Sequence, residues 1–210
     1  ALNTLSLHDA LPISSLANGK TVHFSGKENS ELILENTINQ GAGALYFNNN
    51  MAVRAINNND SWTGAGVVVN GNKTVNWQVK NPQGDRLSKL GTGTLLVNGK
   101  GKNLGDISVG EGTVVLDQKA ENGQQQAFNQ VGLASGRGTV VLANDKQVNP
   151  NNIYFGFRGG RLDLNGNALS FNYIQNADDG AKIVNHNRNQ TASITIGKDL
   201  TENELEWVNW

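Results

Sequence analysis

Three histidines are the residues of this chain best suited to acid–base chemistry, and their surroundings decide whether they can perform it. His8 lies in a leading stretch that matches nothing further along the chain, His23 lies in a strand-like run, and His186 lies among asparagines in a predicted turn. A Ser-His-Asp centre needs a histidine held beside an activated serine. None of the three surroundings indicates such a pairing, so we expect no catalytic triad.

Metal and thiol chemistry are disfavoured by the residue types present. The chain has no cysteine, which excludes disulfides, thiol nucleophiles and cysteine-based metal sites. Three scattered histidines do not make a zinc site. We therefore expect neither metal nor cofactor to be bound by this segment, and the lack of cysteine suits a chain that crosses a periplasm without being locked by oxidation.

A pair of acidic residues offers the sharpest enzymatic alternative. Asp178 and Asp179 lie near Arg158 and Arg188 in the sequence, and paired carboxylates in a surface groove serve carbohydrate hydrolases and lyases. Adjacent residues on a strand point in opposite directions, however, and a following Gly180 favours a turn. The carbohydrate-enzyme reading is therefore kept only as a remote alternative.

Pairs of glycines spaced two apart raise the question of a nucleotide cradle. A phosphate-binding loop must open a helix, whereas these glycines open runs of β-branched and aliphatic residues, so we interpret them as turn glycines. The pairs are Gly91/Gly93, Gly99/Gly101 and Gly136/Gly138.

Exposed aromatic residues could form a patch for a host ligand. We expect Tyr46 and Trp77 to point outward and Trp62 to lie in a turn. Scattered surface aromatics are common, so a purely structural role is favoured over an adhesive one.

Composition indicates the architecture that must carry these residues. Of 210 residues, 25 are glycine and 32 are asparagine, while only 3 are proline. Both abundant residues tolerate positive φ, and their interleaving with Val, Leu and Ile indicates many short strands joined by tight turns. The net charge of −1 is spread without blocks, which argues against a nucleic-acid or anionic-membrane footprint. No apolar run approaches the roughly 20 residues needed for a membrane-spanning helix.

A cassette of a small residue, an apolar strand and a polar stop recurs six times, at residues 43–48, 65–70, 93–98, 112–117, 138–143 and 160–165. Successive starts lie 22, 28, 19, 26 and 22 residues apart, a spacing that fits the coils of a β-solenoid with variable loops. The sequence therefore predicts an all-β fold, a right-handed parallel β-helix of about seven coils, continuous over residues 17–210. Strand-like runs at residues 74–79, 106–109, 153–155, 182–184 and 193–196 supply the other walls.

Alternation within the cassette gives its facing, because Asp163 lies between Leu162 and Leu164 and would be costly to bury. We expect the third and fifth positions to point inward and to stack in two continuous rows, with Asp163 and Arg161 outward. A polar ladder of sixth-position residues is expected along one corner, and residues 118–135 are expected to form a loop. The first row is Leu45, Val67, Leu95, Val114, Val140 and Leu162, the second Phe47, Val69, Val97, Leu116, Leu142 and Leu164, and the ladder Asn48, Asn70, Asn98, Asp117 and Asn165.

The first residues are set apart from this pattern. Residues 1–14 resemble a translated sequencing adapter and lack the basic start of a signal peptide. We treat residues 1–16 as a non-native or disordered stretch and residues 17–210 as one β-helical segment without caps.

Two motifs resemble the passenger region of the IgA-protease-like serine protease autotransporters, peptidase family S6. Lys89-Leu90-Gly91-Thr92-Gly93-Thr94-Leu95 is similar to the autotransporter-associated repeat, Lys-x-Gly-x-Gly-Thr-Leu. Residues 156–167, read Gly-Phe-Arg-Gly-Gly-Arg-Leu-Asp-Leu-Asn-Gly-Asn, are similar to the late stalk of that family, as are the following Phe171, Ile174, Asp179-Gly180-Ala181 and Asn185-His186-Asn187. The resemblance covers roughly residues 17–200.

This resemblance implies a parent virulence factor that is secreted or held at the surface of a Gram-negative bacterium. It implies a serine endopeptidase domain upstream, a translocator β-barrel downstream, and a host surface protein as a possible partner, with this segment as the stalk between. The nucleophile motif Gly-Asp-Ser-Gly is absent from the chain, so no catalytic residue carries over. A stalk from a non-proteolytic adhesin of the same architecture stays open as the alternative.

Overall fold

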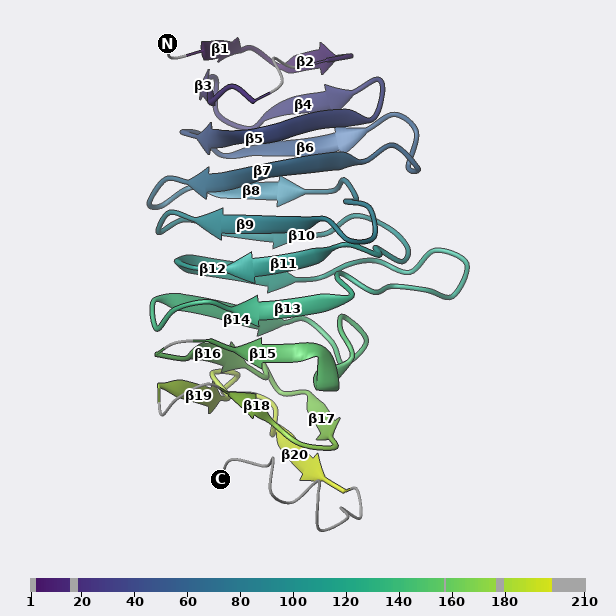
Figure 1. The fold of residues 1–210 in the computed structure, drawn as a ribbon, viewed down its shortest axis with the longest axis vertical. Coiled ribbons are helices and arrows are strands. Elements are labelled where there is room, and N and C mark those ends of the chain that lie inside the picture. The colour runs from purple at the N-terminus through teal and green to yellow at the C-terminus, as the bar shows by residue number, and fades with distance from the viewer. Residues whose placement is uncertain (1–2, 16–18, 157, 177–179, 198–210) are drawn as a thin grey trace.

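The chain winds into a tall stack of short strands in a computed structural model (Figure 1). The structure describes residues 3–15, 19–156, 158–176 and 180–197. Within these ranges every regular element is a β-strand, except for the short 3-10 helix η1 (Pro150–Asn152). The predicted all-β parallel solenoid is confirmed.

Two long parallel sheets form opposite walls of the solenoid, and each coil contributes one strand to each of them (Figure 1). The first sheet contains β1 (Asn3–Leu7), β3 (Val22–Gly26), β5 (Ile38–Phe47), β7 (Trp62–Val69), β9 (Arg86–Leu90), β11 (Asp106–Val109), β13 (Gln130–Leu133), β15 (Ile153–Phe155) and β18 (Gln175–Asn176). The second contains β2 (Ala10–Ile13), β4 (Ser30–Leu34), β6 (Met51–Ala55), β8 (Thr74–Trp77), β10 (Thr94–Val97), β12 (Gly112–Leu116), β14 (Gly138–Leu142), β16 (Gly160–Asp163) and β19 (Ala181–Val184). A two-stranded sheet of β17 (Ala168–Phe171) and β20 (Ser193–Ile196) lies at the C-terminal end.

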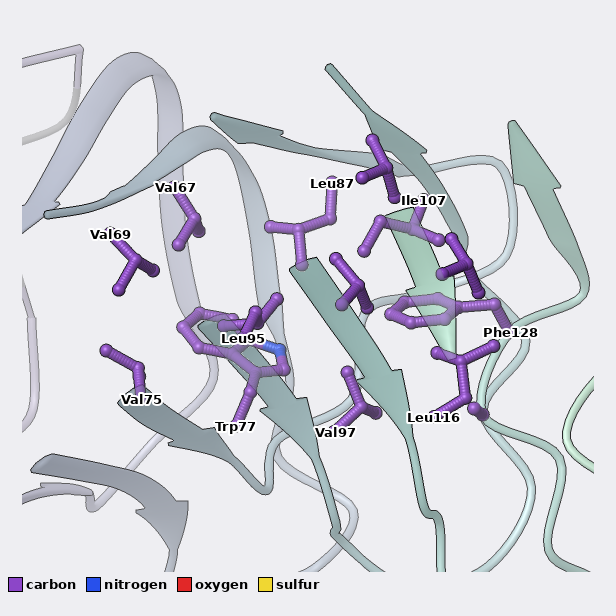
Figure 2. Close-up of a cluster of buried hydrophobic side chains, with 14 of the residues drawn as sticks. Val67, Val69, Val75, Trp77, Leu87, Leu95, Val97, Ile107, Leu116 and Phe128 are labelled. Carbon is purple, nitrogen blue, oxygen red and sulfur yellow. The ribbon is translucent and has the colours of Figure 1, made fainter. Parts of the chain in front are cut away.

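The core lies between the two walls and is built from every second residue of each strand. All twelve apolar side chains predicted to point inward are at most 3% exposed, so the predicted facing is confirmed. Figure 2 shows part of this core, where Val67 and Val69 from one wall lie near Val75 and Trp77 from the other. Each such residue contributes roughly 1.5–3 kcal/mol of hydrophobic stabilisation.

The two predicted continuous rows are wrong, because the cassette changes walls. The cassette strands at 43–48 and 65–70 belong to β5 and β7 in the first sheet, whereas those from 93 onward belong to the second. Val67 therefore pairs in register with Lys89, and Leu95 pairs with Val75. Both walls have the same inward–outward alternation, so the cassette itself does not reveal which wall it occupies.

The loop predicted at residues 118–135 is only partly correct. A tip closed by the antiparallel bridge between Glu121 and Gln124 does project from the solenoid. Residues 130–133, however, form β13, and Ala127 and Phe128 are buried in the core. The missed strand contains a glycine between Val131 and Leu133, which weakens its apolar alternation.

The N-terminal residues also differ from expectation. Residues 3–7 and 10–13 form β1 and β2, which pair in register with β3 and β4. Their alternating leucines and isoleucine fit the walls, so the stretch set aside in the sequence forms a coil, which is one reason why each long sheet has nine strands against about seven coils expected. The resemblance of residues 1–14 to an adapter stays a prediction.

Only the first pair of the predicted polar ladder is formed among the described contacts. Asn70 donates a side-chain hydrogen bond to Asn48, and Asn98 donates one to Asn76 over 3.2 Å. Asn165 instead donates its amide to the backbone carbonyl of Leu142. The change of walls explains the break, because Asn48 and Asn98 lie on different sheets.

Candidate functional site

The contacts of His23 and His8 are structural and do not resemble those of a Ser-His-Asp centre. His23 stacks on Tyr46 with ring centroids 4.6 Å apart, on the outward side of β3 and β5. His8 supplies a backbone carbonyl that accepts a hydrogen bond from the Ser30 hydroxyl. Neither side chain has a hydrogen bond to a serine among the contacts of the described residues.

His186 has a partner that the sequence did not indicate. Its Nδ1 lies 3.4 Å from Oδ2 of Asp163, and its backbone N–H donates to Oδ1 of the same carboxylate over 3.1 Å. Asn165 donates a second backbone N–H to that Oδ1 over 2.9 Å. The imidazole is mostly exposed, whereas Asp163 is only 6% exposed.

The expectation that Asp163 is a surface residue is therefore wrong. Its side chain points away from the core, as predicted. The turn that contains His186, in the next coil, covers it. The carboxylate lies beside the imidazole of His186 from the next coil. A carboxylate held by two backbone N–H groups fastens one coil to the next.

The predicted carboxylate pair, Asp178 and Asp179, lies outside the described residues. Arg158 adopts φ +62° in the turn before β16, and Arg188 is exposed. Within the described ranges, no three His, Asp or Glu side chains gather closely enough to hold a metal ion.

Tyr46 points outward as predicted, but the placements predicted for Trp62 and Trp77 are wrong. Trp62 and Trp77 are each 1% exposed, and their rings lie 5.7 Å apart inside the solenoid. Trp77 also contacts Phe47 edge-on, and Phe47 stacks on Phe24. Trp77 shares its facing with Val75 on β8, so a stricter reading of alternation would have placed it inside.

A lysine occupies the inner row of the first sheet, where its neighbours in register are Val67 and Val109. The Lys89 side chain is completely buried. Its ammonium donates three hydrogen bonds to backbone carbonyls, to Gly91 over 2.6 Å, to Gly93 over 2.6 Å and to Glu111 over 2.8 Å. Gly91 and Gly93 belong to the turn between β9 and β10, whereas Glu111 belongs to the following coil.

The glycines of this motif are turn residues, as predicted, and the geometry requires them. Gly91 has φ +81°, and a Cβ there would collide with the backbone of Val69 in the preceding coil. A Cβ on Gly112, at φ +73°, would collide with the Lys89 ammonium. The motif thus forms a tight corner, and the Lys89 ammonium fills space that Gly112 of the next coil leaves.

Hydrogen bonding at this corner, rather than its electrostatics, keeps the Lys89 amine from reacting. Burial lowers the pKa of Lys89 to about 8, and the negative charge of Glu111 acts in the opposite direction. Glu111 accepts a hydrogen bond from the backbone N–H of Gly91 and lies 3.5 Å from Arg137. All three N–H groups of the ammonium donate to backbone carbonyls. Lys89 therefore links two coils and is not positioned as a nucleophile.

A second buried polar corner lies where the second sheet turns back towards the first. The amide of Asn103 donates to Oδ1 of Asn81 over 2.7 Å, and Oδ1 of Asn103 accepts the backbone N–H of Asn81 over 3.0 Å. The two side chains are 2% and 3% exposed. Their spacing of 22 residues matches one coil, which was the available signal for this ladder.

These buried polar side chains satisfy backbone groups at the corners of the solenoid. Within the described ranges, no helix is both long and apolar enough to span a bilayer. No family model matches the sequence.

The chain is nevertheless closely similar to known proteins over most of its length. It is 60% identical to the Haemophilus influenzae adhesion and penetration protein autotransporter, over 85% of this chain and 13% of that protein. It is 54% identical to the Neisseria gonorrhoeae IgA-specific serine endopeptidase autotransporter, over 89% and 12% of the two. The crystal structure of the Haemophilus influenzae Hap adhesin superposes with a TM-score of 0.82 at 49% identity, covering 89% of this chain and 21% of that one.

Two parallel walls, an apolar interior and polar corner ladders define a parallel β-helix. Combined with these similarities, they identify the chain as a segment of the passenger β-helix of the autotransporter family to which IgA proteases and adhesion and penetration proteins belong. Such passengers are secreted or displayed at the surface of Gram-negative bacteria. The segment spans between 12% and 13% of the length of the two relatives described.

Proposed function

We propose that this chain is a structural spine, one stretch of the stalk that holds a serine endopeptidase domain of the parent protein at or beyond the bacterial surface. In this proposal the segment has no catalytic centre, metal or cofactor, and residues 17–210 form a single β-helical unit. A downstream translocator β-barrel would export the parent, and the endopeptidase domain would lie upstream.

The observation that carries the proposal is the placement of the polar side chains. Lys89, Asp163, Asn81 and Asn103 bind backbone groups of their own or an adjacent coil. Side chains engaged in this way stabilise a rod and are not available to a substrate. The names of the relatives, which include serine endopeptidases, support a protease as the parent.

Active-site labelling tests the proposal directly. The purified chain should show no labelling by a serine-directed fluorophosphonate probe and no hydrolysis of casein or an immunoglobulin hinge peptide. Stoichiometric labelling of a single serine would contradict it, and a denatured sample provides the control for nonspecific labelling.

The rival is a stalk from an adhesin without protease activity, which the adhesion names among the relatives favour. Sequencing the parent gene upstream separates the two. A Gly-Asp-Ser-Gly motif there supports the endopeptidase proposal, and a passenger without it supports the adhesin.

A further inference from the structure

Two neighbouring hollows lie on the outward side of the second sheet, one over β6 and β8 and one over the end of β6 and the residue after β8. One, of about 320 Å³, is lined by Arg54, Gln78, Asn98 and Lys100 together with residues of two projecting loops. The other, of about 380 Å³, lies over Ala52 and Asn76 and reaches Asn29 and Asn50. Arg54 lies two residues after Ala52 and points to the same side, as Gln78 does after Asn76. The two hollows therefore lie end to end along the strand direction.

The wall of the first hollow is built by contacts between distant coils. The side-chain amide of Asn58, in the loop after β6, donates to Oε1 of Glu121 over 3.1 Å and to the carbonyl of Lys100 over 3.3 Å. These partners lie 63 and 42 residues away in the chain. Loops held together in this way by a rigid scaffold are where proteins commonly place binding residues.

Acidic side chains offset most of the positive charge around the hollows. Arg54 lies 3.2 Å from Glu31, Lys119 lies 2.9 Å from Asp117, and Lys100 lines the first hollow together with Glu121. A polyanion such as a nucleic acid needs an excess of available cations, and no aromatic residue lines either hollow to stack a base. This surface therefore does not suit a nucleic acid.

An extended peptide also fits poorly. Peptides that add to a sheet need a free strand edge, whereas β6 and β8 each have a partner on both sides. What the hollows do offer is amide groups, from Asn29, Asn50, Asn76 and Gln78, beside the 69% exposed side chain of Ile56. Amides both donate and accept hydrogen bonds, as sugar hydroxyls do, and an exposed aliphatic side chain can cover the C–H face of a pyranose.

We propose that these two hollows form one binding site for an uncharged oligosaccharide lying along β6 and β8. The amides contact its hydroxyls, Ile56 packs against a ring face, and the ion-paired side chains leave no requirement for a charged ligand. No bond is made or broken, so the site binds without catalysis.

Isothermal titration of the purified chain with maltohexaose and chitohexaose tests this proposal. At least one should bind with a Kd below about 1 mM, whereas a heparin hexasaccharide should bind more weakly. Ala52→Tyr, which fills one hollow, and Gln78→Ala, which removes an amide from the other, should each weaken binding at least fivefold.

Val141→Tyr is the matched control. Val141 lies in the same outward row as Ala52, through Asn76, Leu96 and Val115, but outside both hollows. The Val141→Tyr variant should bind the oligosaccharide with the same affinity as the unchanged chain. Far-ultraviolet dichroism should show that all variants fold. Absence of saccharide binding up to 20 mM, equal weakening by Val141→Tyr, or a preference for heparin would each overturn the proposal.

Discussion

Lys89 and Asp163 are buried side chains of opposite charge, and each is stabilised by hydrogen bonds to the backbone. Lys89 binds carbonyl groups, whereas Asp163 binds N–H groups. Lys89 extends from the inner side of β9 to three carbonyl oxygens. Asp163 lies on the outer side of β16 and accepts two backbone N–H groups beneath the next turn. At a corner the chain leaves the ladder of strand pairing, so carbonyl and N–H groups of both kinds are free to bind a charge.

The comparison also shows why the two residues differ in length and in facing. The flexible lysine stem fills interior space between Val67 and Val109, and its charged end reaches the corner. Aspartate has one methylene group, so it can reach only the backbone directly beside its own strand. We therefore expect substitutions at Lys89 to disturb both packing and hydrogen bonds, and substitutions at Asp163 to disturb hydrogen bonds alone.

Lys89→Ala should have the largest effect, a loss of about 4 kcal/mol in the free energy of unfolding. The substitution removes the apolar stem, leaving a cavity, and deprives the Gly91 and Glu111 carbonyls of their donor. Gly93 still accepts the backbone N–H of Thr113. Lys89→Met keeps most of the stem and should cost about 2 kcal/mol in urea melts; equal losses for the two variants would show that packing contributes nothing.

The free energy of unfolding should also depend on pH through the buried ammonium of Lys89. The pKa of Lys89 is lowered to about 8 from 10.5, so above pH 8 the folded chain releases this proton while the unfolded chain keeps it until about pH 10.5. Stability should therefore rise with pH across this window, by up to about 3 kcal/mol at roughly 1.4 kcal/mol per pKa unit. Below pH 8 both states are charged, so this contribution is constant.

The measurement is the difference between the unchanged chain and Lys89→Met in urea melts from pH 7 to 10.5, since the other lysines titrate in both proteins. A difference that stays flat with pH would mean that the carbonyl oxygens hold the proton as firmly as water does.

Asp163→Ala should cost about 1–2 kcal/mol, because the N–H groups of Asn165 and His186 lose a charged acceptor. A residue on an open surface would change stability by only about 0.5 kcal/mol. Asp163→Asn retains an acceptor oxygen and should lie between the alanine variant and the unchanged chain. A neutral Asp163→Ala result would mean that the covering turn opens to water at no cost.

His186→Ala should have the smallest effect, below about 0.5 kcal/mol. The imidazole is mostly exposed, its contact with Asp163 is long at 3.4 Å, and exposed ion pairs contribute little. The backbone N–H of residue 186 still reaches the carboxylate after the substitution. A loss as large as that of Asp163→Ala, measured in the same urea melts, would shift the role from the backbone to the ring.

The fold class and the facing of the cassette strands were predictable because they depend on local alternation. Trp77 was within reach of the same argument, as it shares a side with Val75. The change of walls was not predictable, since β7 and β10 have equivalent patterns and only long-range pairing separates them. The partners of Lys89 and Asp163 were hidden for a related reason, because Glu111 and His186 lie 22 and 23 residues away across loops of variable length.

The change of walls has a consequence for how such a gene can grow. A cassette that functions equally well in either wall makes half a coil, rather than a full one, the smallest unit that can be duplicated or exchanged. Duplicating half a coil would move every later cassette to the opposite wall while keeping each apolar side chain in the interior. A rod built from such cassettes can therefore change length in steps of half a coil.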